Sequence, residues 1–225
     1  MDLQEARAEG DEGLTFRGVL FDLDGTLIDS YRAIDESLNA VLAAFGRPAV
    51  QMAETRRMVG HGLETLIRQA VGPENVAEGV RIFRASYTET GPRGTSLLPG
   101  AEAVSRALSA RGMKLGIASN KPSYFSRQLV DQLGIGELFP RIAGPDLGFP
   151  AKPDPAMVLD LLRGLGLSAE ETLFVGDMEV DIETARAAGL RVAVIPTGSS
   201  SREELVEARP DHLLERLEEL LDIVA

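Results

Sequence analysis

The sequence predicts an α/β protein with a doubly wound parallel sheet and an all-helical insertion after the first strand. From residue 97 onward, short apolar runs alternate with amphipathic helical patterns, which is typical of a parallel sheet covered on both faces. Residues from about 31 to 94 repeat apolar side chains at helical spacing, with no strand-like run. We therefore expect a polar N-terminal extension over 1–15, a core formed by 16–30 and 95–225, and a helical insertion over 31–94.

The first expected strand ends in two acidic residues. Val19–Phe21 lead into Asp22 and Asp24, which start on one side of an extended chain, and Gly25 permits a turn. Two ionised carboxylates about 4 Å apart repel by roughly 4 kcal/mol at an effective dielectric constant near 20. The pair therefore indicates a bound cation or a carboxyl group that keeps its proton. A plain β-hairpin is an open alternative, because Asp-Gly between apolar flanks is also its strongest short signal.

The later elements are predicted in chain order. Gly91–Thr95 is interpreted as a linker that ends the helical segment. Helices are then expected over Ala101–Arg111, Tyr124–Leu133, Ala156–Leu165 and Ile182–Ala188, and strands over Lys114–Ala118, Arg141–Ala143, Thr172–Val175, Arg191–Ile195 and Asp211–Leu214, with a terminal helix last. Ligands of such sheets bind beyond the carboxyl ends of the strands. The polar residues that follow several of these strands favour a chemical site over the hairpin.

Composition narrows the function classes. With 35 acidic and 23 basic residues the formal charge is -12, which disfavours nucleic acid and anionic membranes as partners. The chain has no cysteine and two histidines, which excludes disulfides, thiolate zinc sites, cysteine nucleophiles and a histidine-rich metal centre. The acidic N-terminus lacks an apolar signal core, and no apolar run approaches membrane-spanning length. We therefore expect a cytoplasmic protein.

Two further segments carry groups that could bind phosphate. Ser119 and Asn120 follow an expected strand and could donate hydrogen bonds to a phosphoryl oxygen, although a helix cap is the simpler explanation of this segment taken alone. Lys152 lies on a segment stiffened by Pro153 and Pro155, and an ordinary surface lysine is its alternative.

A third segment is acidic. Asp177 and Asp181 lie between a strand that closes at Gly176 and the next helix. Acidic residues suit a helix N-terminus, which explains part of the cluster. Hard divalent cations also prefer such oxygen ligands, and Mg²⁺ typically uses one or two carboxylates plus waters.

Together these motifs resemble the haloacid dehalogenase superfamily of phosphohydrolases. The motifs are Asp22-x-Asp24-Gly25-Thr26, Ser119-Asn120, Lys152-Pro153-Asp154-Pro155 and Gly176-Asp177-(x)₃-Asp181. The resemblance implies a Rossmann-like core and a helical cap. Gly60-His61-Gly62-Leu63 and Ser119-Asn120-Lys121-Pro122 are most similar to the phosphoglycolate phosphatase branch. Two positions depart from that branch: Ser119 stands where Thr is common, and Met178 stands where Ser is common.

We hypothesise a mechanism that uses these residues. Asp22 attacks phosphorus to form an aspartyl-phosphate, and Asp24 acts as acid and then as base. Ser119 and Lys152 hold the phosphoryl oxygens. Mg²⁺ is expected on Asp22, the main-chain carbonyl of Asp24, Asp177 and, directly or through water, Asp181.

The expected substrate-binding residues include three in the cap. These candidates are Thr26, Asn120, Arg57, His61 and Gly62. His61 could reach a substrate carboxylate from a glycine turn, although a surface or packing role explains it equally well. Arg57 could do the same, and its alternative is a solvated helix position.

The resulting hypothesis is a Mg²⁺-dependent phosphatase for a small phosphorylated metabolite, with 2-phosphoglycolate as the first candidate. Phosphatases for nucleotides, sugar phosphates or pyrophosphate, and a phosphomutase, are the alternatives. A dehalogenase is disfavoured because, as the resemblance implies, that chemistry does not retain the Asp24 acid. A non-catalytic binding module is disfavoured because all the motifs are intact. The sequence does not indicate whether the protein is a monomer or a dimer.

Overall fold

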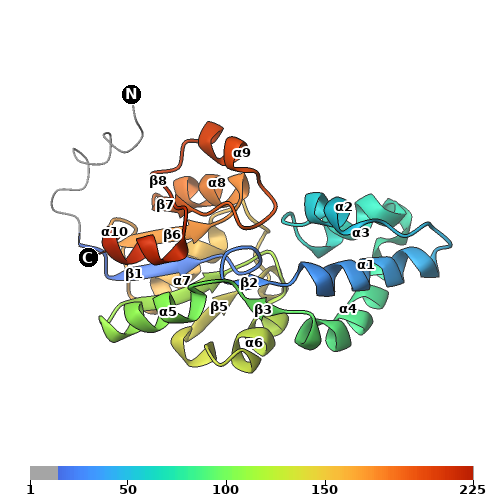
Figure 1. Cartoon of the computed structure of the whole chain (residues 1–225), viewed down its shortest axis with the longest axis horizontal. Coiled ribbons are helices and arrows are strands. Elements are labelled where there is room, and N and C mark those ends of the chain that lie inside the picture. Colours follow the sequence, from blue (N-terminus) through green and yellow to red (C-terminus); the bar gives the residue numbers. More distant parts are fainter. Residues whose placement is uncertain (1–14, 225) are drawn as a thin grey trace.

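The core of the protein is a six-stranded parallel sheet (Figure 1). The structure is a computed structural model that describes residues 15–224, so residues 1–14 of the predicted extension lie outside it. The strands run in the order β5-β4-β1-β6-β7-β8, and each neighbouring pair is parallel. Their bounds are β1 Gly18–Phe21, β4 Lys114–Ala118, β5 Arg141–Ala143, β6 Thr172–Gly176, β7 Arg191–Val194 and β8 His212–Leu213. The predicted sheet is confirmed, and the hairpin alternative for β1 is wrong.

Helices cover both faces of this sheet, because successive strand residues point to opposite sides. Val19 and Phe21 pack in one apolar cluster with α5, α6 and α10, whereas Leu20 packs in another with α7, α8 and α9. The bounds are α5 Ala101–Ala110, α6 Ser123–Gln132, α7 Ala156–Leu165, α8 Glu179–Ala187, α9 Arg202–Glu207 and α10 Leu220–Ile223. None of the helices in the described part of the chain is long and apolar enough to cross a bilayer.

A separate group of four helices lies beyond one edge of the core, at the right of Figure 1. Its bounds are α1 Tyr31–Ala44, α2 Met52–Met58, α3 Leu63–Val71 and α4 Val76–Arg93. Two short strands, β2 (Ile28–Asp29) and β3 (Ser96–Leu97), pair antiparallel where the chain enters and leaves this group. This pair was not predicted, because each strand has only two residues and so carries no periodic pattern.

The predicted linker over Gly91–Thr95 is wrong for its first three residues, which belong to α4. Pro92 lacks an N–H, but the helical hydrogen-bond pattern continues beyond it, since Gly94 N donates to Thr90 O over 2.8 Å. Thr90 is buried, and its hydroxyl lies 2.8 Å from Ser37 Oγ of α1. Packing of this last turn against α1 thus outweighs the local preference of Gly-Pro for a break.

Candidate active site

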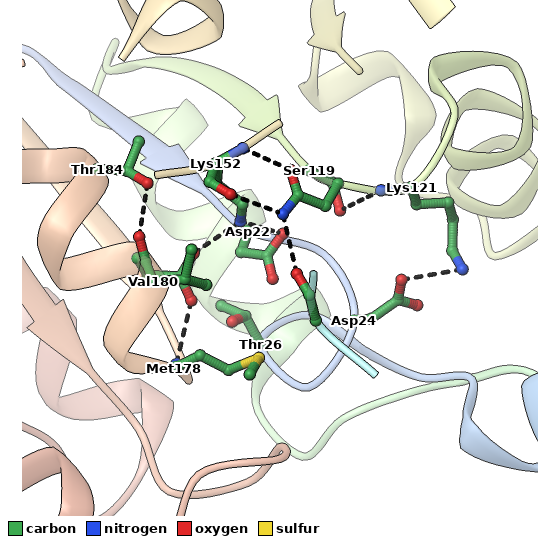
Figure 2. Close-up of polar contacts among 12 residues, drawn as sticks. Asp22, Asp24, Thr26, Ser119, Lys121, Lys152, Met178, Val180 and Thr184 are labelled. Carbon is green, nitrogen blue, oxygen red and sulfur yellow. Dashed lines mark hydrogen bonds and ion pairs between the residues drawn. The ribbon is translucent and has the colours of Figure 1, made fainter. Parts of the chain in front are cut away.

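Residues distant in the sequence meet at the carboxyl ends of the central strands (Figure 2). Asp22 follows β1, Asp177 follows β6, and Asp181 lies in the first turn of α8. Carboxylate oxygens of these three residues lie within 4.8 Å of one another. This is the close group of acidic side chains that the motif order predicted.

Lys152 places an ammonium group inside this acidic cluster. Its Nζ lies 2.8 Å from Asp22 Oδ1 and 2.6 Å from Asp181 Oδ1, and its side chain is 1% exposed. Burial opposes the charged form, but the charges of Asp181 and Asp22 outweigh it and raise the pKa of Lys152 above its ordinary value. Lys152 is therefore a buried cation, and the surface-lysine alternative is wrong.

Asp177 is held in place by two donors. Its Oδ1 accepts from Thr26 Oγ1 at 3.0 Å, and its Oδ2 accepts from Ser199 N at 3.2 Å. Burial, followed by the negative charges of Asp181 and Asp22, raises the pKa of Asp177 well above its ordinary value. Three buried carboxylates facing one lysine leave negative charge uncompensated, so the donor set suits a hard divalent cation.

Asp181 contacts both Lys152 and the backbone at the start of α8. Its Oδ1 accepts from Lys152 Nζ, and its Oδ2 accepts from the backbone N–H groups of Asp177 and Met178, each at 3.1 Å. Burial raises the pKa of Asp181 despite the opposing charge of Lys152. The helix N-terminus explanation is thus correct for this residue, alongside its place in the cluster.

Asp24 turns away from Asp22, toward Lys121 (Figure 2). Its Oδ2 lies 2.9 Å from Lys121 Nζ, and its Oδ1 accepts a hydrogen bond from Ser30 Oγ. Burial opposes the charge of Lys121, but the charge of Asp24 outweighs it and raises the pKa of Lys121. The carboxylate of Asp24 therefore lies outside the acidic cluster, and a role for its main-chain carbonyl in metal binding stays a prediction.

Ser119 and Asn120 follow β4 and both line a cavity next to the acidic cluster. Neither caps α6, which begins at Ser123 after Pro122. Asn120 Oδ1 accepts from Lys152 N at 2.7 Å, and Asn120 Nδ2 donates to Gly60 O at 2.9 Å. The side chain of Asn120 therefore joins the segment that carries Lys152 to the helical group.

The cavity lies between the core motifs and the helical group. Its apolar lining includes Leu63 and Leu66 of α3 and Phe83 and Tyr87 of α4. Among the other substrate-binding candidates, Gly62 lines this cavity as well.

Three of the predicted substrate-binding residues lie elsewhere. Arg57 and His61 are exposed and are not among the residues that line the cavity. Thr26 is buried and donates to Asp177, so it supports the acidic cluster. Contacts of these three residues with substrate stay predictions.

The sequence analysis missed the loop after β7. Besides the contact of Ser199 with Asp177, Thr197 Oγ1 donates to Gly25 O at 2.5 Å, and Ser199 Oγ lies 2.9 Å from Tyr31 Oη. Gly25 has a φ of 86°, and a Cβ there would lie 2.6 Å from Asp177 Oδ2. The available signal was the position of Thr197–Ser199 at a strand's carboxyl end, the same signal that identified Asp177.

Comparison with known proteins identifies the family. The family model described as haloacid dehalogenase-like hydrolase matches residues 19–195. The chain belongs to this family. This haloacid dehalogenase-like hydrolase is 38% identical over 215 residues to a phosphoglycolate phosphatase of Cereibacter sphaeroides, which covers 92% of this chain and 97% of that protein. Phosphoglycolate phosphatase 1 of Pseudomonas aeruginosa is 32% identical over 214 residues, or 91% of this chain and 78% of that protein.

Solved structures agree with the family membership. The crystal structure of a predicted phosphoglycolate phosphatase from Haemophilus somnus has a TM-score of 0.87 and 27% identity to this hydrolase, over 93% of this chain and 98% of that one. The resemblance that the motifs indicated, including its phosphoglycolate phosphatase branch, is thereby confirmed.

Proposed function

We propose that this hydrolase cleaves a small phosphate monoester, with 2-phosphoglycolate as the first candidate substrate. The proposal rests on one observation: three carboxylates and one ammonium group lie together beside a cavity lined by the helical group. These groups belong to Asp22, Asp177, Asp181 and Lys152. The names of the relatives at 32% and 38% identity support the choice of substrate. A cytoplasmic location stays a prediction.

Asp22 is the proposed nucleophile. It attacks phosphorus, an aspartyl-phosphate forms, and the P–O bond to the leaving alcohol breaks. Lys152, 2.8 Å from Asp22 Oδ1, offsets the repulsion between this carboxylate and the anionic substrate. The hydroxyl of Ser119, which lines the same cavity, is placed to hold a phosphoryl oxygen.

Asp24 is the proposed general acid and base. It gives a proton to the leaving oxygen and then takes one from the water that hydrolyses the aspartyl-phosphate. To do so its carboxyl group has to leave Ser30 and Lys121 and turn toward the reacting centre.

Asp22, Asp177 and Asp181 would hold a Mg²⁺ ion, together with the main-chain carbonyl of Asp24. The ion supplies positive charge that lets the anionic nucleophile and substrate approach each other. Residues 31–94 would act as a cap over the core, 16–30 and 95–225, and exclude water from the cavity when substrate is bound.

The test is phosphate release from a panel of esters that contains 2-phosphoglycolate, with Mg²⁺ or with EDTA. We expect turnover with Mg²⁺, none with EDTA, and a loss of about a thousandfold or more in the Asp22→Asn variant, since the attacking group is removed. The thermal unfolding of that variant should stay cooperative, which separates lost chemistry from lost folding. If no ester in the panel releases phosphate, the proposal is overturned. A requirement for a bisphosphate activator would favour a phosphomutase.

A further inference from the structure

Four charged side chains line the cavity in the described part of the chain: Asp22, Asp24, Lys121 and Lys152. Lys152 is engaged by Asp22 and Asp181 on the side where phosphate chemistry is proposed. Lys121 stands on the opposite side of Asp24, against the helical group (Figure 2). The cavity therefore has a second cation that the proposed chemistry leaves unused.

Lys121 lies among apolar side chains, so its buried charge depends on an anionic partner. Its side chain is 8% exposed, and its Nζ lies 4.6 Å from the centre of the Tyr87 ring. Phe83 and Phe125 also line the cavity, and their rings contact the Tyr87 ring, with centroids 5.5 and 4.9 Å away. An ammonium group in such a place needs an anion nearby, because burial of an unpaired charge is costly. Asp24 is that anion in this structure, at 2.9 Å.

We propose that Lys121 binds a second anionic group of the substrate, a carboxylate, and that this carboxylate replaces Asp24 as the partner of Lys121. The inference rests on the proposed function and names the residue that selects its substrate. When the carboxylate of Asp24 turns toward the reacting centre, Lys121 loses its counter-ion. A substrate that brings its own carboxylate restores the pair, whereas an ester with a neutral tail leaves the ammonium group unpaired.

The position of Lys121 also fits a short substrate. Lys121 lines the same cavity as Asp22 and Lys152, and its backbone N donates to Oγ of Ser119, the proposed phosphate-binding hydroxyl, over 3.3 Å, so one small molecule can place its phosphate at the cluster and its carboxylate at Lys121. The two cap residues that could have bound a carboxylate, Arg57 and His61, are exposed and do not line this cavity.

The test compares 2-phosphoglycolate with 2-hydroxyethyl phosphate, in which a neutral alcohol replaces the carboxylate. The wild-type enzyme should prefer 2-phosphoglycolate in kcat/KM, and Lys121→Met should reduce that preference by about 10- to 100-fold, the usual effect of a hydrogen bond to a charged group. Lys121→Arg should retain part of the preference. Lys114→Met is the matched control, because Lys114 is exposed and donates to Leu165 O at the opposite end of β4.

A second readout separates recognition from the effect of Lys121 on Asp24. With 2-hydroxyethyl phosphate as substrate, inhibition by glycolate should weaken about tenfold or more in Lys121→Met, while inhibition by inorganic phosphate should change by less than about threefold. An equal loss of kcat/KM for both esters in a folded variant would overturn the inference, as would a wild-type enzyme that hydrolyses both esters equally well. A wild-type enzyme that hydrolyses no ester would instead contradict the proposed function itself.

Discussion

At Asp177 the burial of a carboxylate beside two others opposes stability in the metal-free protein. Burial and the charges of Asp181 and Asp22 raise its pKa in the folded chain above the value in the unfolded chain. The folded state therefore binds this proton more tightly, and acidification toward the unfolded pKa favours folding. As the pH rises through the raised pKa, that contribution to stability is lost. The proposed metal site thus lowers the stability of the fold when no cation is bound.

The variant Asp177→Asn should accordingly be more stable than the wild type in EDTA at neutral pH. The amide can keep both contacts, because its oxygen can accept from Ser199 N and its NH₂ can donate to Thr26 Oγ1, which can accept as well as donate. We expect a gain of about 1 kcal/mol, or about 2–4 °C in Tm, together with loss of turnover. Thermal unfolding in EDTA and phosphate release with Mg²⁺ measure the two effects.

The pH dependence of the two Tm values tests whether the Asp177 carboxylate causes this difference in stability. The difference in Tm between Asp177→Asn and the wild type should shrink as the pH is lowered from neutral toward the ordinary pKa of an aspartate, because the raised pKa lets the folded wild type take up its proton before the unfolded chain does. Asp131→Asn, at an exposed ion pair with Arg127, should change Tm little at either pH. A wild type more stable than Asp177→Asn in EDTA would contradict the argument.

At the scale of elements, Asn120 joins three segments that the sequence places far apart. It follows β4, it bonds both N and O of Lys152 ahead of α7, and it donates to Gly60 O in the loop before α3. Met178, ahead of α8, packs close to Gly60, because a Cβ at position 60 would lie 2.3 Å from the Met178 sulfur. One loop of the helical group is thus held against two loops of the core.

Asn120→Ala should therefore affect catalysis more than stability. Loss of the contact with Gly60 O frees the helical group from the core, and loss of the contacts with Lys152 loosens the lysine that faces Asp22. We expect kcat/KM to fall by about 10- to 100-fold, which corresponds to about 1–3 kcal/mol. Steady-state kinetics and thermal unfolding of the same preparation measure it.

Asn39→Ala is the matched control for Asn120→Ala. Asn39 also bridges backbone groups, since it bonds both N and O of Val50, but it does so within the helical group. The two variants should lose similar stability, whereas kcat/KM of Asn39→Ala should stay within about threefold of wild type. Equal kinetic losses in both variants would show that Asn120 acts through general stability alone.

The elements that the sequence predicted well are those set by local pattern. The expected strand over Lys114–Ala118 and the expected helix over Ala156–Leu165 match the observed bounds, because apolar periodicity alone marks them. The C-terminal end of α4 was predicted too early, because packing of Thr90 against Ser37 is a tertiary effect that local pattern does not show. The β2–β3 pair was missed because two-residue strands carry no periodicity.

At the scale of the whole molecule, topology explains why part of the site could be predicted. Asp22 and Asp177 follow adjacent parallel strands, so their proximity follows from strand order and direction. The partner of Asp24 could not be predicted, since Lys121 reaches it through side-chain torsions that no spacing reveals. The exposure of Arg57 and His61 depends on how the helical group packs against the core, which is also beyond local pattern.

The whole chain should respond to Mg²⁺ as a folding ligand. The carboxylates that would bind the ion come from segments of the chain brought together by folding, so the unfolded chain lacks the site and binding favours the native state. At 100 times its Kd the ion adds about 2.7 kcal/mol, which corresponds to a rise in Tm of about 5–10 °C for a chain of this length. The rise should be smaller at lower pH, because protons on carboxyl groups with raised pKa values compete with the ion.

Thermal unfolding with and without Mg²⁺, with NaCl at matched ionic strength, tests this response. Screening alone would stabilise a chain of net charge -12, and the NaCl arm measures that contribution. Asp177→Asn should lose most of the Mg²⁺-specific rise, because one of the three buried carboxylates is then neutral. An equal rise in the variant and the wild type would place the ion elsewhere on this acidic surface and contradict a metal site at the acidic cluster.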